Sequence, residues 1–463
     1  MVTSMKSETS DTSSRRAFLR SSALLSAGLA AGCGPSGEEP VEQAAAKRPN
    51  VVLIMSDDLG YECLGSYGGT SYKTPRLDAL AAAGMRFTQA YAQPLCTPTR
   101  VQLMTGAYNF RNWKAFGIMP LEEKTIGHMM TAAGYKTCIS GKWQLHSYNP
   151  PDFEPQWRGT GMHPKDAGFD EHFLWHSEHT EDKGSRYADP VVLNNGTLRT
   201  HDGKYGPDVY TDYVNDFMER NAGGDDPFFV YYPMALPHGP FMPTPHSEVW
   251  AEGDRHKENR KYYSDMVEYM DHVVGHVVDK VNELGIAENT LILYYSDNGT
   301  PREVESHMGD KVIKGGKGHT TDAGTHVPLI ASWKGVIPEG WVNDDLVDST
   351  DFIPTILEAT GAKALPAMTL DGRSFLPQLK GETGDPREWV MFHFDPLPGA
   401  NKVGYKLVRF ARDKRYKLYE ETGELFDIAN DVDEENAITV EHDTTESAAA
   451  RKKLQAVLQQ MRA

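Results

Sequence analysis

The sequence predicts an α/β fold in which helices cover a large sheet whose strands are mostly parallel. Three runs of aliphatic and aromatic residues, at 51–55, 228–236 and 290–295, show no polar alternation, which is typical of parallel strands buried on both faces. Amphipathic segments with helix start and stop signals separate these runs. The 463 residues exceed one ordinary hydrophobic core, so we also expect a second, smaller domain.

The N-terminal segment 1–33 predicts an export signal. A twin-arginine pair precedes the small-residue apolar run 23–31, which is too short to span a bilayer as a mature helix. The residues around Cys33 resemble a bacterial lipoprotein cleavage box, which leaves lipid attachment to Cys33 and plain cleavage nearby as open alternatives. We expect a flexible tether at 34–47 and an exported bacterial protein at the periplasm or the cell surface, with a lipid anchor in the first alternative.

Charge and cysteine content restrict the partners and the redox chemistry. Acidic residues outnumber basic ones by 65 to 47, and the net charge of −18 argues against binding to nucleic acid or to an anionic membrane surface. An anionic substrate would therefore need a local cationic pocket. Cys63 and Cys138 show no disulfide or zinc spacing and are expected to be buried thiols.

Two adjacent carboxylates, Asp57 and Asp58, follow the first buried strand at its C-terminal end. Ligands of open α/β sheets bind at that edge, so the pair is a candidate binding feature as well as a candidate acidic turn. Next along the chain, Thr74 and Pro75 favour the start of a helix that we expect to end at Gly84.

Cys96 precedes Thr97 and Pro98, a pair that can cap and start a helix. The amide groups and dipole of a helix N-terminus favour negative charge there. Arg100, one turn later, adds a forked cation that suits a tetrahedral oxyanion. Taken alone, the pattern also fits a buried structural cysteine, so the rest of the chain has to decide between the two.

A helix over 121–133 and a strand over 135–140 lead to Lys142, which then lies at the C-terminal edge of the sheet. The following segment, 150–206, is rich in Trp, His, Gly and Pro and shows little periodicity. We expect this segment to be loop-rich, either as an insertion or as a wall of the substrate site.

The strand at 228–236 ends close to His238, which two prolines flank. A helix is predicted before it at 207–220 and a long helix after it at 262–284, where apolar residues recur at helical spacing. We expect the two histidines of the long helix to be surface or packing residues rather than ligands.

The strand at 290–295 repeats the pattern of the first strand, because Asp297 and Asn298 follow it. Together with Asp57 and Asp58, these side chains would bring four oxygen donors to one edge of one sheet. Such a set suits a hard cation, Ca²⁺ or Mg²⁺, without any Cys or His ligand.

Basic side chains are predicted at the same edge. Lys317 lies between glycines on a loop that precedes a strand at 327–332. The other basic groups expected there are Arg100, Lys142 and His238. One shared site for a cation and an anion explains this pattern better than a set of independent solvated loops.

The end of the chain predicts a small antiparallel sheet with a helix. Strands are expected at 390–394, 406–410, 416–420 and 424–427. A helix with an apolar stripe begins near Glu446.

Taken in order, these motifs resemble the type I sulfatases of the alkaline-phosphatase-like superfamily. Residues 96–100 are similar to the C-x-P-x-R sequence at which that family converts the cysteine to formylglycine. Supporting segments are 57–60, 74–80, 141–143, 237–238, 296–299, 315–318, 371–377 and 424–428. The resemblance implies a mixed, mostly parallel sheet between helices in a catalytic domain at 48–378, and a four-stranded antiparallel sheet with a helix in a subdomain at 379–463.

The resemblance also implies hydrolysis of a sulfate ester, most simply of a sulfated carbohydrate, after a maturation enzyme has generated formylglycine from Cys96. The hydrate of formylglycine has two hydroxyls, of which one attacks sulfur and the other later expels sulfate. By resemblance, one Ca²⁺, or alternatively Mg²⁺, is bound by residue 96 and four further ligands. Those ligands are Asp57, Asp58, Asp297 and Asn298.

The basic residues receive roles in the same way. Arg100 and Lys142 would fix residue 96 and help to lower the pKa of its hydroxyl. Lys317 and His238 would bind the sulfate, and either could protonate the leaving oxygen.

The sequence departs from the family at Gln144, where many members carry a histidine that deprotonates the hydrate in the second step. An amide cannot act as a general base. His146 and His319 are therefore candidate substitutes, the alternative being slow turnover. His326 stands where an arginine is common.

Two other functions stay open at this point. A phosphodiesterase or phosphonate monoester hydrolase of the same superfamily could direct the same nucleophile at phosphorus. An exported lipoprotein without catalysis could bind sulfated glycans, which would suit the glutamine at position 144.

Overall fold

The computed structural model describes residues 47–147, 155–175, 184–396 and 406–462, which belong to one compact unit, Lys47–Ala463. The predicted export signal, Cys33 and nearly all of the predicted tether lie outside the described residues. No helix within the described residues has the length and apolar character needed to cross a membrane.

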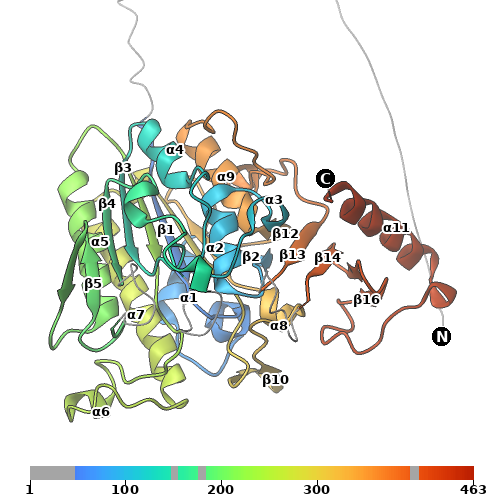
Figure 1. Ribbon diagram of the computed structural model, residues 1–463, viewed down its shortest axis with the longest axis horizontal. Coiled ribbons are helices and arrows are strands. Elements are labelled where there is room, and N and C mark those ends of the chain that lie inside the picture. The colour runs from blue at the N-terminus through green and yellow to red at the C-terminus, as the bar shows by residue number, and fades with distance from the viewer. Residues whose placement is uncertain (1–46, 148–154, 176–183, 397–405, 463) are drawn as a thin grey trace, which may run out of the picture. The chain divides into compact units, whose positions relative to one another are not determined.

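A ten-stranded sheet forms the centre of this unit (Figure 1). Its strands are β1 (Asn50–Ser56), β2 (Met85–Tyr91), β3 (Lys136–Gly141), β4 (Glu171–Trp175), β5 (Val191–Asn194), β6 (Thr197–Thr200), β7 (Phe228–Pro233), β8 (Thr290–Ser296), β11 (Leu329–Ser332) and β12 (Trp341–Asp348). They lie in the order β12-β2-β11-β8-β1-β7-β3-β4-β5-β6. The stretch from β8 through β1, β7 and β3 to β4 is parallel, whereas β11 and β5 run antiparallel to their neighbours. The predicted mixed, mostly parallel sheet is confirmed.

Strand β1 explains why the sheet needs helices on both faces. All seven of its residues are buried. Val51 and Leu53 belong to the hydrophobic core on one face, and Val52 and Ile54 belong to the core on the other. Since side chains alternate along a strand, an unbroken apolar run has to be covered twice.

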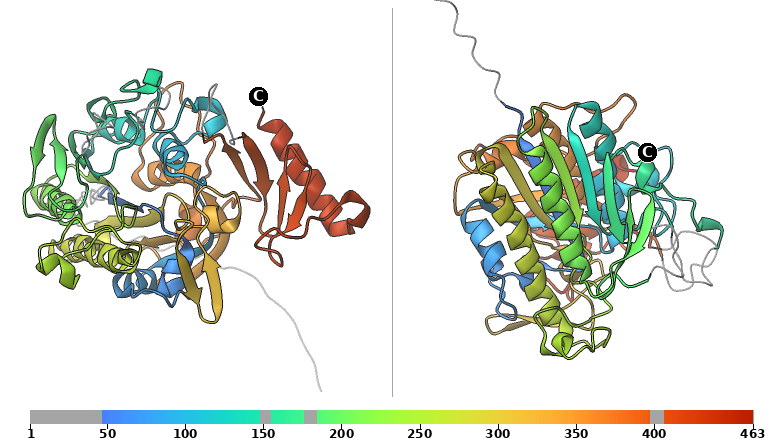
Figure 2. Two further views of the ribbon diagram at one scale, coloured as in Figure 1. Left: turned by 60° about the horizontal axis from the view of Figure 1, so that its bottom comes forward. Right: turned by 90° about the vertical axis from the view of Figure 1, so that its left-hand side faces the viewer.

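Different helices supply the two covers. One core includes residues of α1 (Pro75–Ala82), α5 (Gly206–Asn221) and α7 (Tyr262–Glu283), and the other includes residues of α2 (Cys96–Thr105), α4 (Ile126–Ala132) and α9 (Phe352–Thr360). Figure 2 shows α1, α7 and α5 side by side over one face of the sheet. The long helix predicted at 262–284 is confirmed as α7, which packs on the sheet through its apolar stripe.

The small C-terminal sheet is also confirmed. Its strands are β13 (Val390–Phe394), β14 (Val408–Arg412), β15 (Tyr416–Tyr419) and β16 (Leu425–Asp427), in that order and antiparallel, and α11 (Thr445–Gln460) packs on them (Figures 1 and 2). The sheet contacts the loop after Lys317. Arg412 pairs with Asp322 at 2.5 Å, and buried Lys417 donates a hydrogen bond to the carbonyl oxygen of Thr320. The predicted domain boundary at residue 378 stays a prediction.

One expectation about local structure was wrong. The helix predicted at 121–133 is shorter, because Thr125 caps α4 by accepting a hydrogen bond from the amide of His128, and α4 begins only at Ile126. The described part of the segment 150–206 is loop-rich, as predicted, but it also contains β4, β5 and β6, which were not predicted and which extend one edge of the sheet. The remainder of that segment lies outside the described residues.

Cys63 and Cys138 are buried free thiols, as predicted. Burial raises the pKa of both thiols, so neither is poised for nucleophilic or redox chemistry.

Gly84, which links α1 to β2, packs closely against the backbone of β11. A Cβ at Gly84 would lie 2.1 Å from the carbonyl oxygen of Ala331 on β11. We therefore expect Gly84→Ala to lower the free energy of unfolding by about 1–3 kcal/mol, as overpacking does, measured from the midpoint of urea unfolding. Gly223→Ala is the matched control, because a Cβ there meets nothing within 4 Å and neither glycine has a positive φ. Equal midpoints for the two variants would contradict this account.

Candidate active site

The carboxyl ends of four parallel strands meet at one edge of the sheet, together with the start of α2 and a glycine-rich loop. This arrangement brings together nine residues that the sequence analysis selected for an anion or cation site. They are Asp57 and Asp58 after β1, Lys142 after β3, His238 after β7, Asp297 and Asn298 after β8, Cys96 and Arg100 on α2, and Lys317 on the loop.

The acidic residues form the buried floor of the site. Asp57, Asp58 and Asp297 are at most 2% exposed. The amide of Asp58 donates to Oδ1 of Asp297 at 3.1 Å, and Nδ2 of Asn298 donates to Oδ1 of Asp58 at 2.8 Å. Asp58 has a positive φ of 69°, so the chain turns sharply after β1, and the carboxylates of Asp57 and Asp58 both stay in the site.

Each carboxylate is hydrogen-bonded to one lysine or arginine side chain. Nζ of Lys142 lies 2.6 Å from Oδ2 of Asp57. Nζ of Lys317 lies 2.5 Å from Oδ2 of Asp58. Nη2 of Arg100 lies 2.8 Å and its Nε 3.1 Å from Oδ2 of Asp297, which gives this guanidinium two bonds to one oxygen. Three negative and three positive charges are therefore balanced.

The site is closed on one side and open on the other. The side chains of Lys142 and Arg100 are 1% exposed, whereas those of Lys317 and His238 are 21% and 22% exposed. An anion from solvent would therefore meet Lys317 and His238 first.

The pairing shifts the acid–base equilibria of the floor. Burial by itself would raise the pKa of Asp57, but Lys142, His238 and Arg100 together hold it well below its usual range. Burial and the neighbouring Asp57 raise the pKa of Asp297 to about 7, despite Arg100. The formal charges balance, but burial and repulsion between neighbouring carboxylates still disfavour the ionised form of Asp297.

Cys96 is the first residue of α2 and is 1% exposed. Its Sγ lies within 4.8 Å of carboxylate oxygens of Asp57 and Asp297. Burial raises the pKa of the thiol, although Lys142 and Lys317 oppose this. Leu95, not Thr97, occupies the N-cap and makes no side-chain cap, so the predicted capping role of Thr97 was wrong.

Two buried oxygens in the floor indicate that the residues present fit a cation. Oδ1 of Asp57 and Oδ1 of Asn298 have no hydrogen-bond partner among the described residues. A buried acceptor without a donor is costly, and carboxylate and amide oxygens are what Ca²⁺ and Mg²⁺ prefer. The candidate groups of metal ligands found among the described residues overlap at Asp57, which favours one ion.

His238 connects the floor to a residue that the sequence analysis missed. Nε2 of His238 lies 3.7 Å from Oδ2 of Asp58. Nη1 of Arg186 lies 3.2 Å from Nδ1 of the same imidazole. Burial lowers the pKa of His238 to about 3. Asp58 opposes this shift and Lys317 adds to it, so the imidazole is neutral. Arg186 lies in the segment whose fold could not be predicted, and no motif marks it.

The contacts described for the two candidate substitute bases, His146 and His319, are made with residues outside the charged cluster. Nδ1 of His146 is 2.8 Å from the carbonyl oxygen of Gly161. His319 is exposed, and burial together with Arg302 lowers its pKa. Gln144 has a positive φ of 54° and a buried Oε1 without a hydrogen-bond partner among the described residues. The choice of base stays a prediction.

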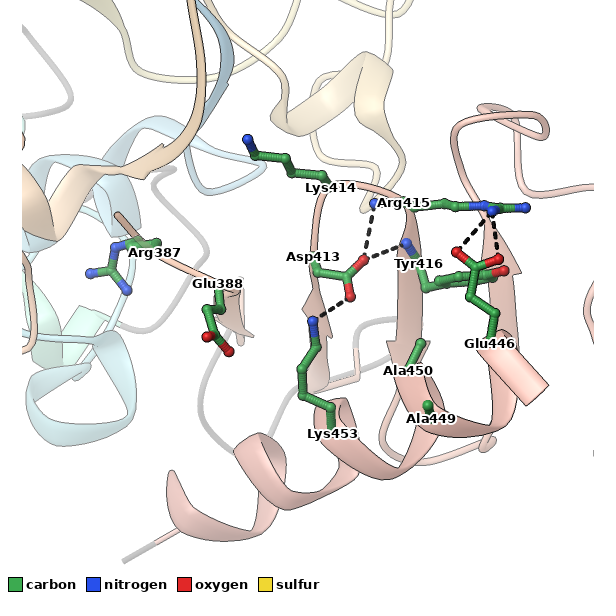
Figure 3. A pocket seen from close by; sticks show the side chains of 10 residues that line it. All are labelled: Arg387, Glu388, Asp413, Lys414, Arg415, Tyr416, Glu446, Ala449, Ala450 and Lys453. Carbon is green, nitrogen blue, oxygen red and sulfur yellow. Dashed lines mark hydrogen bonds and ion pairs between the residues drawn. The ribbon is translucent and has the colours of Figure 1, made fainter. Parts of the chain in front are cut away.

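A cavity of about 500 Å³ on the C-terminal sheet is separate from this cluster (Figure 3). Four of its charged residues pair within the wall, since Lys453 pairs with Asp413 at 2.6 Å and Arg415 pairs with Glu446 at 2.8 Å (Figure 3). Its acidic lining residues belong to no candidate group of metal ligands among the described residues, and no cysteine, serine or threonine lines it, so the cluster at the sheet edge is the candidate active site.

Thr99 ties α2 to the strand end that carries Asp297, since its hydroxyl lies 2.6 Å from the carbonyl oxygen of Asp297. We expect Thr99→Val to lower the free energy of unfolding by about 1–2 kcal/mol, because this buried acceptor loses its donor. Thr360→Val is the comparison, because it removes bonds to near neighbours in the chain: those to the carbonyl oxygens of Ile356 and Leu357, and one from the amide of Ala362 just beyond α9. The stabilities of the two variants are compared through their calorimetric unfolding midpoints. A Thr99→Val midpoint at or above that of Thr360→Val would argue against the tie.

Comparison with known proteins agrees with this geometry. Residues 49–362 match the Sulfatase family, and residues 317–463 match the C-terminal region of the N-sulphoglucosamine sulphohydrolase family. Arylsulfatase A of Homo sapiens is 33% identical over 370 residues, which cover 76% of this chain and 71% of that protein. N-acetylgalactosamine-6-sulfatase of Canis lupus familiaris is 30% identical over 412 residues, covering 81% and 73%.

A solved structure shares the fold over almost the whole chain. Ps i-CgsB in complex with k-i-k-neocarrahexaose has a TM-score of 0.67 and 25% sequence identity, and the match covers 89% of this chain and 92% of that one. The family match spans the residues that build the cluster at the sheet edge. The chain therefore belongs to the sulfatase family of the alkaline-phosphatase-like superfamily and is a sulfuric ester hydrolase.

Proposed function

We propose that this sulfatase removes sulfate from a sulfated carbohydrate, with formylglycine derived from Cys96 as its reactive group and with one divalent cation. The observation that carries the proposal is the position of Cys96 at the first turn of α2, where its Sγ lies within 4.8 Å of carboxylate oxygens of Asp57 and Asp297, in a cluster whose three carboxylates are paired with three cations. The carbohydrate substrate is supported by the names of the similar proteins, two of which refer to an aminosugar sulfatase and to a complex with an oligosaccharide.

Asp57, Asp58, Asp297 and Asn298 would hold the cation, Ca²⁺ or alternatively Mg²⁺. The two unpartnered oxygens of Asp57 and Asn298 and the raised pKa of Asp297 support this assignment. When bound, the cation supplies Lewis-acid stabilisation of negative charge on the nucleophile and on the sulfate. The ion would also add two positive charges to a balanced cluster, which favours binding of an anion.

The basic residues would divide the remaining work. Arg100 and Lys142, which are fully buried, would hold the carboxylates and residue 96 in place. Lys317 and His238, on the open side, would bind the sulfate. Asp58 raises the pKa of Lys317 against the effect of burial, so the ammonium keeps its charge, while the neutral His238 can still donate a hydrogen bond.

Maturation would have to precede folding. Residues Cys96, Pro98 and Arg100 are buried in the folded chain, so a formylglycine-generating enzyme could reach them only in an unfolded segment. Such an enzyme is therefore the proposed partner. Export to the periplasm or cell surface, with or without a lipid on Cys33, completes the proposal and rests on the N-terminal sequence alone.

The first test is the chemistry of residue 96. We expect the peptide that contains this residue, isolated from the native host, to have the mass of an aldehyde in place of a thiol. Cys96→Ala should lower sulfate release from sulfated oligosaccharides and aryl sulfates by at least about 1,000-fold, because the nucleophile is lost. Cys138→Ala removes another buried thiol and should keep activity.

Three outcomes would separate the alternatives. An unmodified cysteine in all molecules from the native host would leave the proposed mechanism without its nucleophile. Cleavage of phosphodiesters but of no sulfate would favour the phosphohydrolase. Binding of sulfated glycans without any turnover would favour a non-catalytic lipoprotein.

The second test is the cation. Removal of divalent ions by a chelator should lower the thermal unfolding midpoint, and Ca²⁺ or Mg²⁺ should restore it, since an ion at 100 times its Kd stabilises the folded state by about 2.7 kcal/mol. Asp58→Asn should abolish this response. Asp279→Asn, an exposed acid on α7, should retain it. A midpoint in the wild-type protein that neither ion changes would contradict the site.

A further inference from the structure

Arg186 is a partly buried arginine with no carboxylate partner. Its guanidinium lies over the ring of Trp175, with Cζ 4.0 Å from the ring centroid, and its Nη1 lies 3.2 Å from Nδ1 of His238. No ion pair joins this guanidinium to a carboxylate in the part of the chain that the structure describes. A guanidinium that is taken partly out of water usually has an anionic partner, so this one calls for an explanation.

The backbone around Arg186 is held firmly at the loop after β7. The hydroxyl of Tyr187 donates to the carbonyl oxygen of Ala235 at 2.7 Å and also contacts that of His238. On the other side, Ala188 forms a β-bridge with Tyr205. Arg186 is therefore positioned by the fold before any ligand arrives, which lowers the entropy cost of binding.

Arg186 lies outside the balanced charges of the active site. His238 separates it from Asp58, the carboxylate that Lys317 already neutralises. Among the described residues no carboxylate neutralises the positive charge of Arg186, in a chain whose net charge is −18. It is also on the open side, next to the residue that an incoming sulfate would meet first.

Only part of the guanidinium is used by His238. Nδ1 of His238 contacts Nη1 of Arg186 at 3.2 Å and the carbonyl oxygen of Gly239 at 2.5 Å, so the imidazole takes at most one N–H of the guanidinium. The same group has several further N–H donors, and none has a hydrogen-bond partner among the described residues. Those donors form the planar fork that binds a carboxylate or a sulfate through two bonds.

We propose that Arg186 binds a second anionic group of the substrate, beside the sulfate that is removed. The substrate would then be an acidic sugar sulfate, which carries either a uronate carboxylate or a second sulfate next to the scissile one. This inference rests on the proposed carbohydrate substrate and makes Arg186 a binding residue that determines specificity.

Two matched substrate pairs test the proposal. One pair is a sulfated disaccharide with a hexuronate and the same compound with its carboxyl group reduced to the alcohol. The other pair is a disulfated and a monosulfated form of one monosaccharide. For at least one pair, Arg186→Met should lower kcat/KM for the doubly charged member by about 10- to 100-fold, mainly through KM. The loss on its singly charged partner should be clearly smaller.

Two further variants control for charge and for packing. Arg186→Lys keeps the charge but not the fork, and should restore part of the loss. Arg255→Met removes an arginine that likewise lies over a tryptophan, Trp250, with Cζ 5.1 Å from the ring, and should leave both members of each pair unaffected. The pair that responds identifies the carboxylate or the sulfate as the bound group.

The proposal is overturned if Arg186→Met lowers kcat/KM equally for both members of both pairs, because Arg186 would then only orient His238. It is also overturned if the wild-type protein does not prefer either doubly charged member. If no sulfate is released from any compound, the proposed function fails by itself. In that case, calorimetry measures binding of the doubly charged compounds to the Cys96→Ala protein and to the double variant that also carries Arg186→Met. Weaker binding by the double variant supports the subsite, and equal binding overturns it.

Discussion

Each buried carboxylate at the sheet edge is neutralised by a cation that comes from a different part of the chain, and this pairing constrains the whole large domain. Lys142 after β3, Arg100 on α2 and Lys317 on the glycine-rich loop meet Asp57, Asp297 and Asp58. Removing such charges from water costs several kcal/mol for each unpaired ion. The strands must therefore be parallel and in register, because only then do their polar ends arrive at one place while their apolar bodies stay buried.

The same pairing explains how an acidic protein can attract an acidic substrate. The protein's own charges in the cluster cancel, so a divalent cation would set the sign of the local potential, while the net charge of −18 is spread over the rest of the chain. Lys317 and His238 are the exposed members of the cluster. Specificity can then arise beside them without disturbing the buried charges, as the position of Arg186 illustrates.

The sequence was informative where chemistry follows a long apolar run. Asp57, Lys142, His238 and Asp297 could be placed at one edge because each follows a buried strand, and the structure brings them together. Strands β5 and β6 were not predicted, since the apolar run of β5 is only three residues long and β6 is fully exposed and carries no hydrophobic pattern. Arg186 follows from no local pattern either, because its neighbours Trp175 and His238 become close only through tertiary structure.

The contact between the small sheet and the loop after Lys317 ties the active site to the C-terminal part of the chain. Lys417, held by Glu434 at 2.6 Å, binds Thr320, and Arg412 binds Asp322, so β14 and β15 support the loop from outside. The match to the C-terminal family region begins at Lys317 itself, well before the small sheet. The lysine loop and the sheet that braces it therefore form one structural unit, and loosening of the small sheet would release Lys317 from its place beside Asp58.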